Sequence, residues 1–177
     1  GPFEPPLIHG VATYSLEFLR STPELQTVYV PIGMGSGISG MIAARDALGL
    51  TTKIVGVVAE NAPAYALSFA KGEAVSTNTA NTLADGVACR TPDAAAVSII
   101  NKGADRIVSV SEDEITHAMG CYFTDTHNLA EGAGAVPLAA LLKEKDQIAE
   151  SCVGLVLSGG NVDRSLFSQV LKTPLGA

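Results

Sequence analysis

The residues with the clearest chemical potential form a glycine-rich loop, Gly33-Met34-Gly35-Ser36-Gly37, directly after a β-branched run. Backbone N–H groups that curl around an oxyanion need conformations that a Cβ disfavours, so such a loop favours glycine. A helix that begins at the end of the loop adds the partial positive charge of its N-terminus, and the Ser36 hydroxyl is a further donor. The loop therefore predicts a binding site for a phosphate group.

The same segment allows a second interpretation, because residues Gly35 to Gly40 spell G-x-G-x-x-G. Glu60 ends the next expected strand, where an acid that binds a ribose hydroxyl lies in dinucleotide-binding proteins. Against this, Gly33 starts the turn earlier than the fingerprint needs, and the stretch 61–89 contains no obvious strand. A nicotinamide-dependent oxidoreductase built on Gly35, Gly37 and Gly40 is one alternative, and a non-catalytic module that binds a phosphate ligand is another.

The elements that must position this loop alternate between strands and helices. Near-continuous apolar runs predict buried parallel strands; they lie at 27–32, 53–60 and 152–158, with a shorter one at 106–110. Helices are expected at 13–20, 37–48, 92–102, 112–122, 131–145 and 163–172. This order predicts a three-layer α/β fold with an open, mostly parallel sheet and helices on both faces.

Helix-start signals support two of these helices. Thr91 is the expected N-cap of the helix at 92–102, with Pro92 at its first position. Ser111 and Glu114 form a capping box for the helix at 112–122. Because ligands in open α/β sheets bind beyond the carboxyl ends of strands, the loop at 33–40 and the segment Ser158-Gly159-Gly160-Asn161 are expected to face one pocket.

Composition excludes several classes of partner. Of the 177 residues 47% are apolar and 16% charged, and the net charge of −7 argues against nucleic acid and anionic membranes as partners. No apolar run approaches the roughly 20 residues of a membrane span. The three scattered cysteines, Cys89, Cys121 and Cys152, predict reduced thiols in a cytoplasmic protein.

Motifs along nearly the whole chain resemble, in the same order, those of the serine/threonine dehydratase group of fold-type II pyridoxal-phosphate enzymes. The motifs are Gly10-Val11-Ala12-Thr13-Tyr14-Ser15-Leu16-Glu17, the loop 33–37, Thr82-Leu83-Ala84-Asp85-Gly86, Glu131-Gly132-Ala133-Gly134-Ala135 and Ser158-Gly159-Gly160-Asn161. The group usually has glycine at the positions of Met34 and Ser36 and proline at that of Gly132. The variants at 10–14 and 33–37 look closer to a subgroup associated with hydroxyectoine breakdown.

The resemblance implies the large domain of the tryptophan synthase β-like fold and a pyridoxal 5′-phosphate cofactor. By this resemblance, Gly33–Gly37 hold the phosphate, Ser158 meets the pyridine nitrogen, and Glu131 lies near the ring or the substrate. The implied reaction removes the β-hydroxyl of a small-molecule substrate, a threonine- or serine-like amino acid, to give a 2-keto acid and ammonia. A hydroxylated diamino acid and 3-hydroxyaspartate are further candidate substrates.

The resemblance also implies a cation site beside the phosphate loop. Its ligands fall on the Glu60 carboxylate and the Ala64 carbonyl, while Ala66 stands where a third ligand would be a carboxylate. Glu60 and Ala64 are therefore the two candidate ligands for Mg²⁺ or a monovalent cation.

One element of the group is not found in these residues. The group's nucleophile is a lysine in an S-F-K-x-R-G motif, which forms a Schiff base with the cofactor, and none of the lysines present stands in that motif. In the group this motif lies upstream of the segments matched by this chain. We therefore expect 1–177 to be one α/β domain, without the small domain and the lysine segment, with no catalytic residue and inactive by itself. The full-length protein is expected to be a homo-oligomer, a dimer or tetramer.

Overall fold

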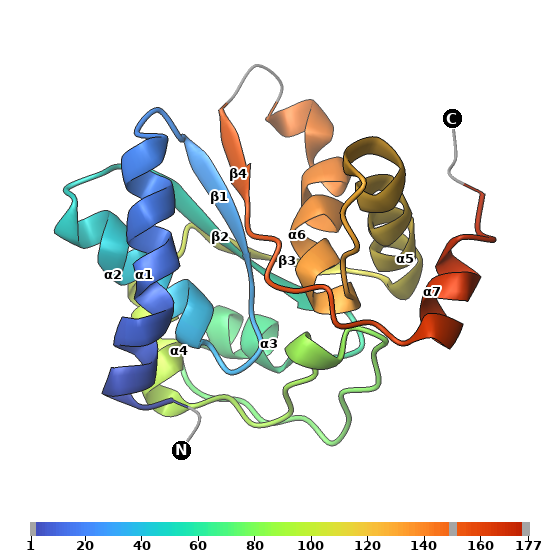
Figure 1. Ribbon diagram of the computed structural model, residues 1–177. Helices are drawn as coiled ribbons and strands as arrows, with labels where there is room; N and C mark the ends of the chain where they lie inside the picture. The colour runs from blue at the N-terminus through green and yellow to red at the C-terminus, as the bar shows by residue number, and fades with distance from the viewer. Residues whose placement is uncertain (1–2, 149–151, 175–177) are drawn as a thin grey trace.

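Four short apolar segments pair into one parallel sheet. The computed structural model describes residues 3–148 and 152–174. The strands are β1 (Thr27–Pro31), β2 (Lys53–Ala59), β3 (Arg106–Val110) and β4 (Val153–Leu155), in the spatial order β3-β2-β1-β4 (Figure 1). All three neighbouring pairs are parallel, with Thr27 opposite both Lys53 and Val153. The predicted parallel sheet is confirmed, although β4 is shorter than the apolar run that predicted it.

The strand order contains a switch point. The chain runs from β1 outward through β2 to β3, and then returns to place β4 on the other side of β1. The connections that leave the carboxyl ends of β1 and β4 therefore diverge to different sides of the sheet. Crevices at such points are the usual ligand sites of open α/β sheets.

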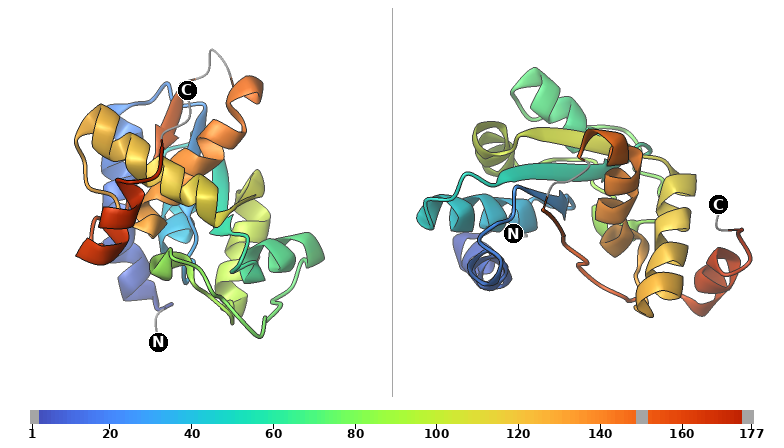
Figure 2. Two further views of the ribbon diagram at one scale, coloured as in Figure 1. Left: turned by 90° about the vertical axis from the view of Figure 1, so that its right-hand side faces the viewer. Right: turned by 90° about the horizontal axis from the view of Figure 1, so that it is seen from above.

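Helices cover both faces of the sheet, as Figure 2 shows from above. One layer holds α1 (Pro5–Ser21), α2 (Ser36–Ala47), α3 (Ala64–Lys71) and α4 (Ala94–Gly103); the other holds α5 (Glu112–Cys121), α6 (Gly132–Lys143) and α7 (Arg164–Val170). Side chains alternate between the two layers along β1, since Val28 and Val30 pack with Met41 of α2, whereas Tyr29 packs on the side of Val136 in α6. The three-layer α/β architecture is thus the predicted one.

Short helical turns complete the chain. Two are 3-10 turns and one is a π-turn that extends α5; they are η1 (Asp85–Val87), η3 (Lys145–Gln147) and η2 (Tyr122–Thr126). None of the helices described is both long and apolar enough to cross a membrane.

Helix boundaries differ from prediction where side chains compete for the cap. α4 begins at Ala94, and its N-cap is Asp93, whose carboxylate accepts hydrogen bonds from the N–H groups of Ala95 and Ala96. The prediction of Thr91 as N-cap is therefore wrong. The capping box of Ser111 and Glu114 at the start of α5 is confirmed.

Two helices extend or add to the prediction. α1 begins at Pro5 rather than at residue 13, because prolines in a first turn carry the helical φ and lose no hydrogen bond there. α3 was not predicted at all. Pro63 precedes it and Gly72, with a φ of +81°, ends it, so start and stop signals were present in the stretch 61–89.

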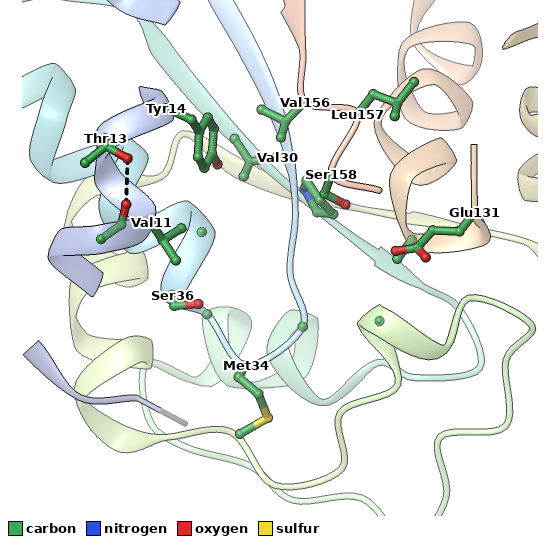
Figure 3. Close-up of a pocket in the computed structure, with 17 residues that line it drawn as sticks. Val11, Thr13, Tyr14, Val30, Met34, Ser36, Glu131, Val156, Leu157 and Ser158 are labelled. Carbon is green, nitrogen blue, oxygen red and sulfur yellow. Dashed lines mark hydrogen bonds between the residues drawn. The ribbon is translucent and has the colours of Figure 1, made fainter. Parts of the chain in front are cut away.

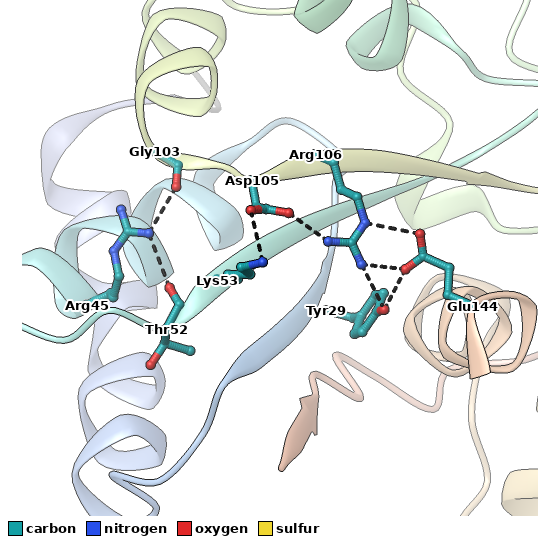
Figure 4. A network of polar contacts seen from close by, with 8 residues as sticks. All are labelled: Tyr29, Arg45, Thr52, Lys53, Gly103, Asp105, Arg106 and Glu144. Atoms are coloured by element: carbon teal, nitrogen blue, oxygen red, sulfur yellow. Dashed lines mark hydrogen bonds and ion pairs between the residues drawn. The ribbon is translucent and has the colours of Figure 1, made fainter. Parts of the chain in front are cut away.

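At the amino ends of the strands a polar network ties α6 to the sheet (Figure 4). The Arg106 guanidinium donates to both oxygens of Glu144, at 2.6 and 3.0 Å, and the Tyr29 hydroxyl donates to the same carboxylate at 2.5 Å. Asp105 accepts a further bond from Arg106 at 2.7 Å. This network joins β1, β3 and the last turn of α6 at the end of the sheet opposite to the glycine loop.

Candidate functional site

A cavity of about 670 Å³ lies at the switch point, beyond the carboxyl ends of β1 and β4. Its walls come from α1, the end of β1, the glycine loop, η1, the start of α6 and the segment that follows β4 (Figure 3). The residues predicted for the site that line it are Gly33, Met34, Gly35, Ser36, Gly37, Glu131 and Ser158. Segments more than a hundred residues apart thus face one cavity, as predicted, and the volume lies within the usual range of ligand sites, about 300–1,000 Å³.

Two glycines of the loop are required by the backbone. Gly35 is the N-cap of α2 and has a φ of +93°, a left-handed conformation that L side chains rarely adopt. Gly33 lies against the chain of η1, so closely that a Cβ there would be 2.2 Å from the Gly86 carbonyl oxygen. The loop therefore curls tightly between α2 and η1.

The amide N–H groups of the loop are open to a ligand. Within the described residues no acceptor pairs with the N–H groups of residues 33–37, whereas the carbonyls of Met34 and Gly35 accept bonds from Tyr65 and Ser39. No lysine or arginine of the described part lines the cavity. An anion bound there would be held by backbone N–H groups and by the N-terminus of the 12-residue helix α2.

The wall next to the loop is contributed by α1. The Tyr14 ring lies beside Val30, and its hydroxyl is 3.7 Å from the position that a Cβ on Gly37 would take (Figure 3). Burial raises the pKa of Tyr14, and the neighbouring Ser15 hydroxyl opposes this. Tyr14 was not among the predicted site residues. It lies four residues after Gly10, so the two share one face of α1, and this spacing could have indicated that both line the cavity.

Glu131 and Ser158 form the side of the cavity that lies beyond the carboxyl end of β4. Ser158 is exposed to the cavity, and Glu131 is the half-buried residue that precedes α6. The Glu131 N–H donates to the Gly159 carbonyl at 3.1 Å, and its carboxylate accepts the Asn161 N–H at 3.1 Å. Glu131 therefore anchors the S-G-G-N segment, a role that sequence analysis missed because the partner lies in a distant loop.

Among the described residues Glu131 is the only carboxylate on the cavity wall. The donor set fits a phosphorylated aromatic ligand: open N–H groups at the phosphate end, apolar walls from Val11 and Val156, and one hydroxyl and one carboxylate at the far end. A Cβ at Gly33 would overlap the backbone of η1, so the loop needs glycine at this position in order to curl there.

The two candidate cation ligands have other partners. The Glu60 carboxylate is exposed and lies 3.4 Å from the Lys143 ammonium, while the Ala64 carbonyl accepts the Ser68 hydroxyl at 2.7 Å. No group of three or more His, Cys, Asp or Glu side chains in the described part of the chain is arranged to hold a metal ion. The cation site stays a prediction.

The last glycine of the G-x-G-x-x-G pattern serves helix packing. A Cβ on Gly40 would be 3.1 Å from the Ala12 Cα, so Gly40 allows α1 and α2 to approach closely. In a dinucleotide-binding motif the third glycine instead allows the helix to pack on the strand. Gly40 thus completes the G-x-G-x-x-G pattern in the sequence, but its packing role differs from that of the third glycine in the dinucleotide-binding fingerprint.

Comparison with known proteins agrees with this geometry. Residues 2–159 match the family described as pyridoxal-phosphate dependent enzyme. The chain is 35% identical to L-threonine ammonia-lyase of Thermotoga maritima, over 98% of this chain and 43% of the relative. It is 38% identical to the enzyme of that name from Geobacter sulfurreducens, over 99% and 44%. It is 37% identical to the catabolic L-threonine dehydratase of Escherichia coli, over 94% and 51%. The chain spans about half the length of the curated relatives it matches.

Solved structures show the same fold. Threonine deaminase isoform 2 of Solanum lycopersicum superposes with a TM-score of 0.90 and 29% identity, over 97% of this chain and 51% of that one. A threonine deaminase described as from T.th. gives 0.85 and 33%, over 92% and 61%, and maize serine racemase 0.84 and 30%, over 93% and 51%. These neighbours confirm the predicted fold class.

Proposed function

Because this chain belongs to the pyridoxal-phosphate dependent enzyme family, we propose that it forms the phosphate-binding part of the active site of a hydroxy amino acid ammonia-lyase. The whole protein removes the β-hydroxyl and the amino group of its substrate and yields a 2-keto acid and ammonia. The observation that carries this proposal is the set of open N–H groups at 33–37, which shares one cavity with Ser158 and Glu131.

The loop residues bind and orient the cofactor. The N–H groups of 33–37 and the Ser36 hydroxyl hold the 5′-phosphate, and the positive end of α2 favours its negative charge. Ser158, at the far side of the cavity, accommodates the pyridine nitrogen. Bound pyridoxal phosphate supplies an electron sink for bond breaking at the amino acid's α-carbon.

Ser158 determines the protonation of the ring nitrogen, and Glu131 positions the segment that carries Ser158. A neutral hydroxyl at the ring nitrogen leaves that nitrogen largely unprotonated, which tempers the electron sink and suits loss of a β-hydroxyl. Glu131 keeps the loop that carries Ser158 in place through its bonds to Gly159 and Asn161. The substrate class is a threonine- or serine-like amino acid, supported by the names of the relatives, L-threonine ammonia-lyase and L-threonine dehydratase. The hydroxyectoine-related subgroup and its diamino acid substrate stay a prediction.

We further propose that residues 1–177 are one α/β domain and that they do not turn over substrate by themselves, since the S-F-K-x-R-G lysine motif is not among them. A cytoplasmic location is supported by the three free thiols at Cys89, Cys121 and Cys152. A homo-oligomeric assembly of the whole protein is part of the same proposal.

A nicotinamide cofactor is the competing ligand, and thermal unfolding separates the two. A ligand that binds only the native state at 100 times its Kd stabilises it by about 2.7 kcal/mol, which is a rise of roughly 5–10 °C in the midpoint for a chain of this size. We expect pyridoxal phosphate to raise the midpoint, NAD to leave it unchanged, and pyridoxal, which has the same aldehyde without the phosphate, to act much more weakly. A rise with NAD and none with pyridoxal phosphate would overturn the proposal.

A further inference from the structure

Tyr65 lies directly behind the glycine loop and is 2% exposed. It belongs to the first turn of α3, the helix that follows β2, and it is not among the residues that line the cavity. Its hydroxyl donates a hydrogen bond to the Met34 carbonyl oxygen at 2.7 Å. Tyr65 thus contacts the loop from the side opposite to the cavity.

This hydrogen bond sets the direction of a peptide group. The described residues contain no cis peptide bond, and in a trans peptide the C=O and the next N–H point in opposite directions. Since the Met34 carbonyl points to Tyr65, the Gly35 N–H points away from Tyr65 and toward the cavity. The bond therefore places one of the phosphate-binding donors.

A restraint of this kind is needed because the loop is intrinsically free to rearrange. A peptide followed by glycine can flip, which exchanges related turn conformations at little steric cost. In the flipped form the cavity would face a carbonyl oxygen, which repels an anion. Packing adds to the restraint, since a Cβ on Gly35 would lie 2.8 Å from the Ala96 Cβ and 2.9 Å from the Tyr65 hydroxyl oxygen.

We propose that Tyr65 is a positioning residue for phosphate recognition: its hydroxyl holds the Met34–Gly35 peptide in the orientation that presents the Gly35 N–H to the ligand. This inference rests on the proposed function of the loop. Tyr65 touches no ligand and acts only through the backbone.

The test compares Tyr65→Phe with Tyr29→Phe in the 177-residue chain. Both tyrosines are fully buried and donate one hydrogen bond, but Tyr29 does so to Glu144 at the opposite end of the sheet. The readout is the ratio of the Kd values for pyridoxal and pyridoxal phosphate, measured by fluorescence titration. Loss of stability alone weakens both ligands together and leaves this ratio unchanged.

We expect Tyr65→Phe to raise the Kd for pyridoxal phosphate about 3- to 10-fold, as for the loss of one neutral hydrogen bond, and to leave the Kd for pyridoxal unchanged. Tyr29→Phe should keep the ratio of the unchanged chain. Should Tyr65→Phe fail to fold, Tyr65→Met gives the same test, because an unbranched side chain adapts to the space.

The possible failures are distinct. If the unchanged chain binds pyridoxal phosphate no more tightly than pyridoxal, the proposed phosphate site fails, and the role of Tyr65 with it. If the unchanged chain distinguishes the two ligands and the Tyr65 variant distinguishes them equally well, the positioning role alone is overturned.

Discussion

The Glu131 carboxylate accepts a hydrogen bond at 3.1 Å from the backbone N–H of Asn161, 30 residues further along the chain. The Glu131 N–H donates in return to the Gly159 carbonyl, so two bonds fasten the segment after β4 to the start of α6. Ser158 directly precedes Gly159, the first residue of this segment that is bonded to Glu131. The cavity wall therefore depends on the contacts between an acidic residue and a loop that is distant from it in the sequence.

The two glycines of the S-G-G-N segment should respond differently to alanine. A Cβ on Gly160 would be 2.4 Å from the Leu129 carbonyl oxygen, which is backbone, whereas one on Gly159 would be 2.7 Å from a Glu131 carboxylate oxygen, which can move. We expect Gly160→Ala to lower the free energy of unfolding by about 1–3 kcal/mol and Gly159→Ala to lower it less. Gly159→Ala should instead weaken binding of pyridoxal phosphate by displacing Glu131. Equal losses of stability in urea unfolding would contradict this account.

The glycine loop offers a sharper substitution. Gly33→Ala places a methyl group 2.2 Å from the Gly86 carbonyl oxygen, and neither backbone can move without opening the loop. We expect this variant to lose its preference for pyridoxal phosphate over pyridoxal. Gly49→Ala is the control, because Gly49, whose φ is +65°, has open space around it and does not line the cavity. The control should lose about 1 kcal/mol of stability from left-handed strain and keep the preference; loss of the preference in both variants would contradict the role of the loop.

The network at the other end of the sheet predicts a pH-dependent contribution to stability. The hydrogen bond from Arg106 holds the pKa of Glu144 below its ordinary value, with burial opposing and Tyr29 assisting. A carboxyl group with a lowered folded-state pKa stabilises the fold above its unfolded pKa, near 4.5, and this contribution is lost as the pH falls through the folded value. Glu144→Gln should therefore lower the free energy of unfolding at pH 7 by about 1–3 kcal/mol, and the difference should shrink toward about pH 3.

Urea unfolding of the two proteins across this pH range checks the prediction. Glu73→Gln is the control, since Glu73 pairs with Lys71 at 2.7 Å but both side chains are more than 60% exposed. Such a pair contributes little, so the control should follow the unchanged chain at every pH. A Glu144→Gln difference that is independent of pH would show that its cause is packing and not the charge.

Most of the fold and the outline of the site could be predicted from the sequence. Apolar runs located all four strands, and the glycine-rich segments marked the two loops that face the cavity, because these features depend on local backbone needs. Helix boundaries were less predictable where neighbouring caps compete, as Asp93 does with Thr91. α3 was not predicted because it is short and lies in an Ala- and Thr-rich stretch without a strand.

The residues that hold the site in shape could not be predicted. Tyr65 and Gly86 contact the loop across 31 and 53 residues of chain, and Glu131 reaches Asn161 across 30. Each contact depends on how separate βα units pack, and no local periodicity encodes that. The glycine-rich motifs indicated which backbone segments approach a ligand, whereas the contacts that support those segments could be identified only from the folded structure.

The most direct test of the central claim is to map where pyridoxal phosphate binds, by following backbone amide resonances of the ¹⁵N-labelled chain during a titration. The account predicts that the largest shifts occur at residues 33–37 and at Ser158, and that the shifts in the loop are lost when pyridoxal replaces pyridoxal phosphate. Unchanged resonances at 33–37, with shifts confined to other parts of the chain such as the amino ends of β1 and β2, would contradict it.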